Sequence, residues 1–105
     1  MASENFNLDL AKVLETALEL VTKDRANQHG DAFEQHASIA DFWTLYMVNK
    51  GLMDPDRSLE AHDVAQMMVL LKVSRAMLGS FNADTYIDQC GYAALTYAIM
   101  NRIPQ

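Results

Sequence analysis

Hydrophobic side chains recur at helical spacing in four separate stretches of this chain. The pattern predicts an all-α, bundle-like domain with helices over about residues 8–27, 32–50, 59–78 and 83–101. The first stretch carries a single apolar stripe that includes Leu10, Leu14 and Leu18. The third is apolar around most of its circumference between residues 64 and 73, so we expect it to be the central helix.

Polar residues and glycines mark the expected ends of these helices. Asn7, Asp31 and Ser58 are suitable N-caps, because their side chains can accept a hydrogen bond from a free N–H group of the first turn. Asp31 followed three residues later by Glu34 resembles a capping box. Gly79 is expected to end the third helix.

The second predicted helix is apolar on two sides. One stripe consists of Phe33, Ala37, Ala40 and Met47, and the other of Ile39, Trp43 and Tyr46. A helix of this kind packs against more than one neighbour or against another subunit. Together with the apolar run over residues 67–73 of the third helix, it predicts a homodimer or a homotetramer.

Composition narrows the class of protein. The 105 residues suit one domain, and half of them are hydrophobic. The net charge of −6 argues against non-specific binding to nucleic acid or to anionic membranes, and no apolar run approaches the ~20 residues of a membrane span. Cys90 has no second cysteine to pair with, and the N-terminal residues lack a signal-peptide pattern, so we expect a cytoplasmic protein.

Short connections between the helices favour an up-down-up-down bundle. In that order the turn near residue 30 and the turn after Gly79 lie at the same end. The polar residues expected at that end are Arg25, His29, Asp31, Glu34, Arg75, Asp84 and Asp88, with Lys72 one turn deeper. Asp63 falls at the opposite end, more than ~20 Å from the Gly79 turn, and would reach this cluster only from a second subunit.

Carboxylates that converge with cations can bind a metal ion and a phosphate together. The candidate ligands for Mg²⁺ or Mn²⁺ are Glu34, Asp63, Asp84 and Asp88. The candidate substrate-binding groups are Arg25, His29, Lys72 and Arg75. Glu34 and Asp88 are also candidate catalytic residues, because a carboxylate can orient or deprotonate a metal-bound water.

Each of these residues also has a structural explanation. Asp63 and Asp84 lie near helix starts, where a carboxylate is stabilised by the helix dipole. Asp88 can form a salt bridge with Lys72 or Arg75. His36 and His62 are expected to be surface or packing residues, and Met67, Met68 and Met77 core residues. The expected clustering at one end is what favours a functional interpretation.

Three blocks of the sequence resemble a small, largely phage-encoded MazG-like family of unknown function. KDRANQHGDAFEQHASIADFW resembles the pattern R…YGxxxENFxxIAxLW, and DVAQMMVLLKVSR and DTYIDQCGYAAL resemble DVAxMMxLLKxxR and DxxxDxxGYA. The resemblance covers residues 23–95. His29 replaces the usual Tyr, and Gln35-His36 replaces Asn-Phe.

That family is similar to the all-α NTP pyrophosphatases, which assemble as dimers or tetramers. The resemblance implies cleavage of a nucleoside triphosphate to monophosphate and pyrophosphate, with Mg²⁺ bound by acidic helices. The signature of those hydrolases is EExxE on one helix and ExxD on the next. This chain has no EExxE, although Glu60-x-x-Asp63 and Asp84-x-x-x-Asp88 follow the same order.

Three functions are consistent with these patterns. The first is a Mg²⁺- or Mn²⁺-dependent nucleoside triphosphate pyrophosphohydrolase of phage or cellular nucleotide metabolism. The second is a phage protein that binds or sequesters a nucleotide without catalysis, which suits the missing EExxE. The third is a helical interaction module whose charges are solvated pairs. Metal-dependent turnover separates the first from the second, and any nucleotide binding excludes the third.

Overall fold

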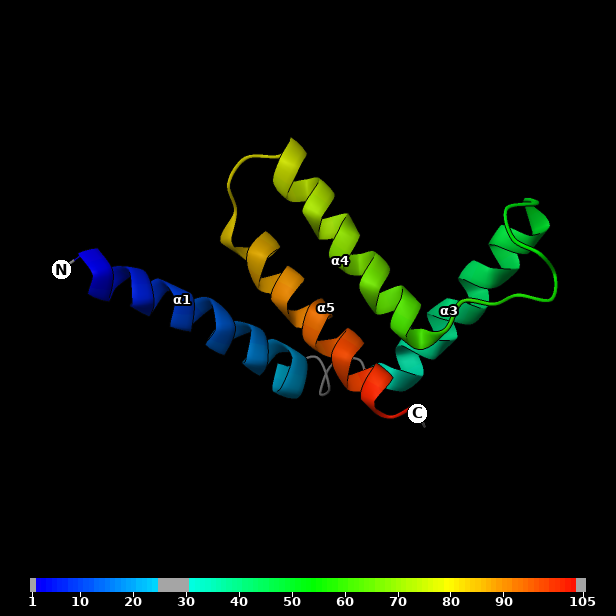
Figure 1. The fold of residues 1–105 in the computed structure, drawn as a ribbon, viewed down its shortest axis with the longest axis horizontal. Coiled ribbons are helices and arrows are strands. Elements are labelled where there is room, and N and C mark those ends of the chain that lie inside the picture. Colours follow the sequence, from blue (N-terminus) through cyan, green and yellow to red (C-terminus); the bar gives the residue numbers. More distant parts are fainter. Residues whose placement is uncertain (1, 25–30, 104–105) are drawn as a thin grey trace.

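The computed structural model describes residues 2–24 and 31–103, which are all-helical and include no strand (Figure 1). Its elements are α1 (Ala2–Glu19), the π-helical turn η1 (Leu20–Asp24), α3 (Ala32–Asn49), α4 (Ala61–Leu78) and α5 (Ala83–Asn101). The all-α class is therefore confirmed, and the last three helices lie within two residues of their predicted ranges. No helix in the described ranges is long and apolar enough to cross a membrane.

The helix caps explain most of these boundaries. Asp31 is the N-cap of α3, since its Oδ1 accepts a hydrogen bond of 2.8 Å from the N–H of Phe33, as predicted. The cap predicted at Ser58 is wrong, because Glu60 holds that position and forms a capping box with Asp63. The cap predicted at Asn7 is also wrong, since α1 begins at Ala2.

The α4–α5 hairpin turns at Gly79 and forms the centre of the fold, with α1 against one side and the start of α3 against the other (Figure 1). The buried core near the far end of the hairpin contains Ala61, Ala65 and Ile99. Gly91 allows α1 to approach closely, because a Cβ there would lie 3.0 Å from Cγ1 of Val21. This close approach gives a packing reason for a glycine inside α5.

The chain does not follow the predicted up-down-up-down order. Gly51 takes a φ of 77°, and residues 50–60 then return alongside α3, where the N–H of Leu59 donates to Oγ1 of Thr44 at 2.8 Å. This segment is long enough, at ~3.3 Å per extended residue, to run back along the outer half of α3. As a result α3 and α4 begin at the same end and diverge (Figure 1).

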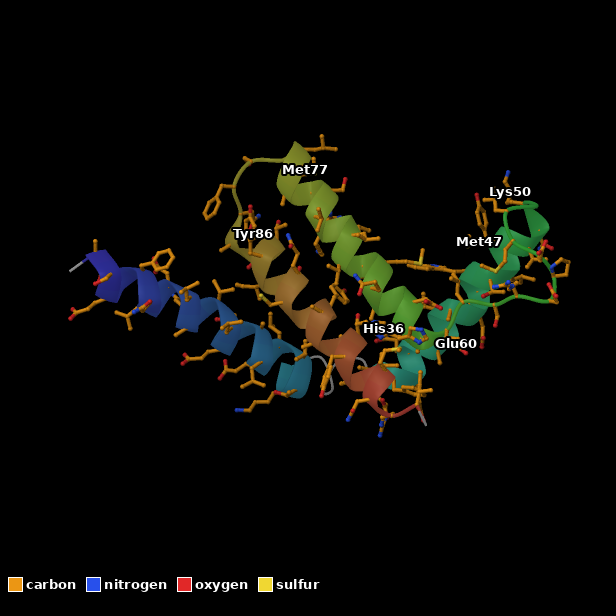
Figure 2. All side chains as sticks on the ribbon, in the orientation of Figure 1. His36, Met47, Lys50, Glu60, Met77 and Tyr86 are labelled. Atoms are coloured by element: carbon orange, nitrogen blue, oxygen red, sulfur yellow. The ribbon has the colours of Figure 1, made fainter. Side chains whose placement is uncertain are left out.

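The arrangement is open rather than closely packed. The principal dimensions are 57 × 31 × 29 Å, and the outer half of α3 extends away from the hairpin (Figure 1). Met77, predicted to be a core residue, has 78% of its surface exposed. That prediction fails because, of the described elements, α5 is the main one that covers the C-terminal half of α4 (Figure 1). Met47 lies in the outer half of α3, and Lys50 directly follows the end of that helix (Figure 2).

Candidate functional site

Lys72 of α4 and Asp88 of α5 form an ion pair, with 2.9 Å between Nζ and Oδ2. The Lys72 side chain is 14% exposed and the Asp88 side chain 26% exposed. The pair therefore joins the two arms of the hairpin in a half-buried position. The predicted approach of Asp88 to one of the two cations of α4 is confirmed.

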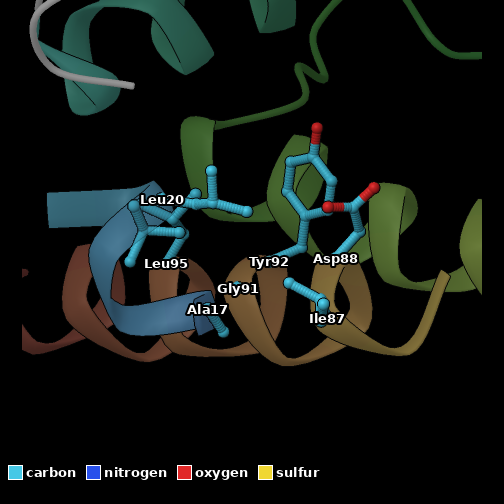
Figure 3. A pocket seen from close by; sticks show the side chains of 8 residues that line it. Ala17, Leu20, Ile87, Asp88, Gly91, Tyr92 and Leu95 are labelled. Carbon is cyan, nitrogen blue, oxygen red and sulfur yellow. The ribbon is translucent and has the colours of Figure 1, made fainter. Parts of the chain in front are cut away.

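The space beside this ion pair is too small for a nucleotide. Asp88 borders a cavity of about 10 Å³ between α5 and the end of α1, and the other lining residues include Leu20, Gly91 and Tyr92 (Figure 3). That volume holds about one water molecule. Among the described residues, the pair joins two helices, and this cavity beside Asp88 is too small for a ligand.

The other residues predicted to join Asp88 lie elsewhere. Glu34 is exposed near the start of α3. The start of α3 lies close to the end of α5, because the Arg102 guanidinium lies over the Phe33 ring, 5.5 Å from its centroid. Asp84 is exposed at the start of α5, roughly 25 Å away by helix rise. The predicted clustering is therefore wrong, because the returning segment places the start of α3 at the end opposite Gly79.

Three further residues complete the predicted substrate-binding set. Arg75 is exposed and borders an open hollow at the Gly79 turn. Arg25 and His29 lie outside the described residues. The role predicted for these cations and for Lys72 in binding phosphate stays a prediction.

A different cluster lies where α4 begins. Glu60, His62 and Asp63 each offer one potential metal-ligating atom, and these atoms lie within 4.8 Å of one another. Nδ1 of His62 is 3.6 Å from Oε2 of Glu60, and Nε2 is 3.5 Å from Oδ1 of Asp63. Imidazole nitrogen and carboxylate oxygen together suit a divalent transition-metal ion.

The capping box fixes two members of this cluster. The N–H of Glu60 donates to Oδ2 of Asp63 at 2.9 Å, and the Glu60 side chain accepts from the backbone N–H of Asp63 in return. These bonds hold both carboxylates at the helix start. Oδ1 of Asp63 takes no part in them and faces His62. Nδ1 of His62 is buried and has no hydrogen-bond partner among the described residues.

A cavity of about 360 Å³ adjoins this cluster, between the start of α4, α3 and the end of α5. Its volume falls in the range of small-molecule sites. Asp41, Glu60 and His62 form a polar wall. The rest of the lining is mostly apolar and consists of Phe33, Ala37, Ala40, Ser58, Leu59, Ala61, Ile99 and Ile103. Figure 2 shows Glu60 at the junction where α3 and α4 begin.

His36 belongs to the packing of this junction. Its side chain is buried, and its ring contacts that of Tyr92 edge-on at 6.3 Å between centroids. Nδ1 lies 2.7 Å from the carbonyl oxygen of Ala32, which can only accept, so Nδ1 carries the proton. The predicted packing role of His36 is confirmed.

Residues 12–100 of the chain match the family described as a domain of unknown function, DUF6378. The chain belongs to the DUF6378 family. It is 39% identical over 83 residues to the Gene 55 protein of Mycobacterium phage L5, a match that covers 79% of this chain and 49% of that protein. The Gene 55 protein of Mycobacterium phage D29 is 27% identical over 81 residues, which cover 77% and 48%.

The DUF6378 chain therefore spans about half the length of the curated relatives it matches. No solved structure matches it. The family and its phage relatives confirm the predicted kinship with a phage family of unknown function. The chemistry of the DUF6378 domain has to be argued from its own side chains.

Sequence reasoning missed the cluster of Glu60, His62 and Asp63 beside the cavity of the DUF6378 domain. Asp63 is the only member that the sequence pattern indicates as a ligand. Glu60 enters that interpretation only through the pair Glu60-x-x-Asp63, which falls at the end opposite the predicted site. Glu60-x-His62-Asp63 does carry a signal, since three ligating residue types fall within one helical turn. The contribution of Asp41 could not be read from the sequence, because it depends on the path of residues 50–60.

Proposed function

We propose that this domain cleaves a nucleoside or deoxynucleoside triphosphate to the monophosphate and pyrophosphate, with Mn²⁺ or Mg²⁺ held by Glu60, His62 and Asp63. The observation that supports this best is the convergence of three ligating atoms within 4.8 Å beside a cavity of ligand size. Mg²⁺ prefers oxygen ligands, whereas a set that includes an imidazole favours Mn²⁺.

The charge of the cavity wall makes nucleotide binding depend on the metal. Asp41 and Glu60 line the cavity, Asp63 adjoins it, and all three carry carboxylates. A triphosphate approaching them without a cation is repelled. A divalent ion held by Glu60, His62 and Asp63 would offset this negative charge and would supply electrostatic stabilisation for phosphate chemistry. Arg102, whose guanidinium lies over Phe33 at the cavity edge, is the nearby cation for phosphate contact.

Asp41 is the third carboxylate near the cavity and acts as the general base. Asp41 is exposed and is not one of the three clustered ligands, so it is free to accept a proton. A water oxygen bonds to the α-phosphorus, the bond from that phosphorus to the leaving pyrophosphate oxygen breaks, and the water proton passes to Asp41.

We also propose the wider setting of this activity. The resemblance to MazG-like proteins supports a homodimer or homotetramer, as do the many exposed apolar side chains. The phage relatives support action in the cytoplasm of an infected host, on its nucleotide pool.

A second candidate function is binding of a nucleotide without turnover. The lining of the cavity includes no Lys or Arg among the described residues, so Arg102 at its edge is the one cation near a leaving pyrophosphate. Catalysis of phosphoryl chemistry usually has several such groups. This shortage favours a nucleotide-sequestering protein. The third candidate, an interaction module, is favoured by the exposed apolar surface alone.

One assay separates these functions. Each common nucleoside and deoxynucleoside triphosphate is incubated with the protein and Mn²⁺, Mg²⁺ or EDTA, and the products are separated by chromatography. The melting temperature of the protein is measured under the same conditions. We expect monophosphate and pyrophosphate with Mn²⁺ and none with EDTA. Stabilisation by metal and nucleotide without products identifies the sequestering protein. If no nucleotide changes the melting temperature, both nucleotide functions are wrong.

A further inference from the structure

The divergence of α3 and α4 leaves an apolar hollow between them. Trp43, Tyr46 and Met47 of α3 and Met67 of α4 line this α3–α4 groove, which has a volume of about 460 Å³. Among the described residues, no charged side chain lines it. A second hollow of about 210 Å³ shares Trp43 and continues along α4 past Val64. Tyr46 is 61% exposed.

The chain exposes far more surface than a compact protein of its mass. Its accessible surface is 7786 Å², whereas a folded monomer of 11.8 kDa exposes about 5,900 Å². Its radius of gyration is 16.2 Å, against about 13 Å for a compact domain of this length. The excess of roughly 1,900 Å² falls within the range of about 1,000–2,500 Å² that each chain of an obligate homodimer buries.

We infer that a second copy of this chain occupies the α3–α4 groove, with the outer half of its own α3 as the inserted element. The exposed apolar residues of that ridge are Phe42, Leu45 and Tyr46. The ridge and the groove lie side by side on the same chain, so a two-fold axis lets each copy fill the groove of the other. This inference specifies the oligomer of the proposed function and does not depend on the metal site.

The residue types in the groove agree with a specific interface. Trp, Tyr and Met are enriched at the buried centres of protein interfaces, and charged residues are depleted there. Trp and Tyr also make the largest contributions when they are buried in such contacts. The groove lining consists of these residue types alone.

The first test compares the mass of three proteins by sedimentation and light scattering. Tyr46→Glu places a charge in the groove, and Tyr97→Glu makes the same change on α5, where the tyrosine is 72% exposed. We expect the parent and Tyr97→Glu to be dimers or tetramers at about 20 µM, a concentration at which ordinary specific interfaces persist. Tyr46→Glu should weaken association at least about 30-fold.

The second test needs no variant, because Trp43 is the one tryptophan of the chain and lies in the groove. Its acrylamide quenching is measured while the parent is diluted from about 50 µM to about 0.1 µM, which spans ordinary affinities. We expect quenching to rise as the mass falls. Mn²⁺ binding by Tyr46→Glu is titrated in parallel. This measurement shows whether the metal site is intact, so a failure of the interface is distinguished from a failure of the metal site.

The outcomes are decisive in both directions. A monomeric parent at about 20 µM, or a dimer whose Trp43 is quenched equally before and after dissociation, overturns the inference. The first result would assign the groove to another occupant, such as the further length that the phage relatives possess. Loss of the dimer in Tyr46→Glu, with Tyr97→Glu unchanged, supports it.

Discussion

Lys72 and Asp88 lie 2.9 Å apart and connect the two central helices in a half-buried position. Neither side chain is free to bind a ligand without giving up its partner. A pair of this kind is costly to break, because removal of one partner leaves the other charge poorly solvated. We therefore interpret the pair as a positioning contact for the hairpin.

Lys72→Met and Asp88→Asn should each lower the free energy of unfolding by about 1–3 kcal/mol. The double variant should lose less than the sum of the two, because no uncompensated charge remains. Urea denaturation of the four proteins in this cycle measures the coupling. Lys12→Met, which removes an exposed cation from α1, is the control and should change stability by less than about 0.5 kcal/mol. Strict additivity of the two changes would contradict this interpretation.

Gly91→Ala should destabilise the protein although alanine is the better helix former by about 1 kcal/mol. The added Cβ would lie 3.0 Å from Cγ1 of Val21, and a valine side chain has little freedom to rotate away. We expect a net loss of about 1–2 kcal/mol, within the range for overpacking. Gly91→Ala combined with Val21→Ala should be more stable than the sum of the single changes predicts. A gain in melting temperature for Gly91→Ala alone would show that α1 does not pack here.

Asp31→Ala and Asn82→Ala should each cost about 1 kcal/mol, because each side chain accepts a 2.8 Å hydrogen bond from the first turn of its helix. Asp31→Asn keeps an acceptor and is the matched control, with an expected loss of a few tenths of a kcal/mol. Ser58→Ala should have little effect, since Glu60 is the cap of α4. Thermal unfolding of the four variants tests the assigned helix starts.

The helices were readable from the sequence because their boundaries are local. Asp31 begins α3 by accepting a short-range hydrogen bond, and Gly79 is the C-cap at which α4 ends, so both positions agree with the prediction. The cap predicted at Ser58 lies two residues before the observed cap, Glu60. The reciprocal bonds of Glu60 and Asp63 make the longer side chain effective there.

The arrangement of the helices was less readable because it depends on one connection. Residues 50–60 contain a proline and several acidic residues, which predict a loop but not its direction. The loop returns along α3 and is held by the Thr44 hydroxyl, so the start of α3 meets the start of α4. This single difference removes Glu34 from the neighbourhood of Asp84 and places Asp41 beside the Glu60 cluster.

The two alternative metal sites are distinguished by paired variants. Asp63→Asn and His62→Gln should weaken Mn²⁺ binding at least about tenfold, because each removes one of three ligands near the cavity. Asp84→Asn and Asp88→Asn make the same kind of change at the residues first predicted as ligands, and should leave Mn²⁺ affinity unchanged. Isothermal titration calorimetry gives each affinity directly.

Asp63→Asn also alters the capping box, so the comparison needs a measure of folding. The asparagine retains an oxygen that can accept the hydrogen bond from the N–H of Glu60, and the helical circular dichroism should therefore be preserved. His62→Gln leaves both capping bonds untouched and is the cleaner test. If His62→Gln binds Mn²⁺ as tightly as the parent while Asp88→Asn loses it, the metal belongs at the α4–α5 hairpin. The opposite result places it at the start of α4, where a triphosphate would bind only after the metal has neutralised Asp41, Glu60 and Asp63.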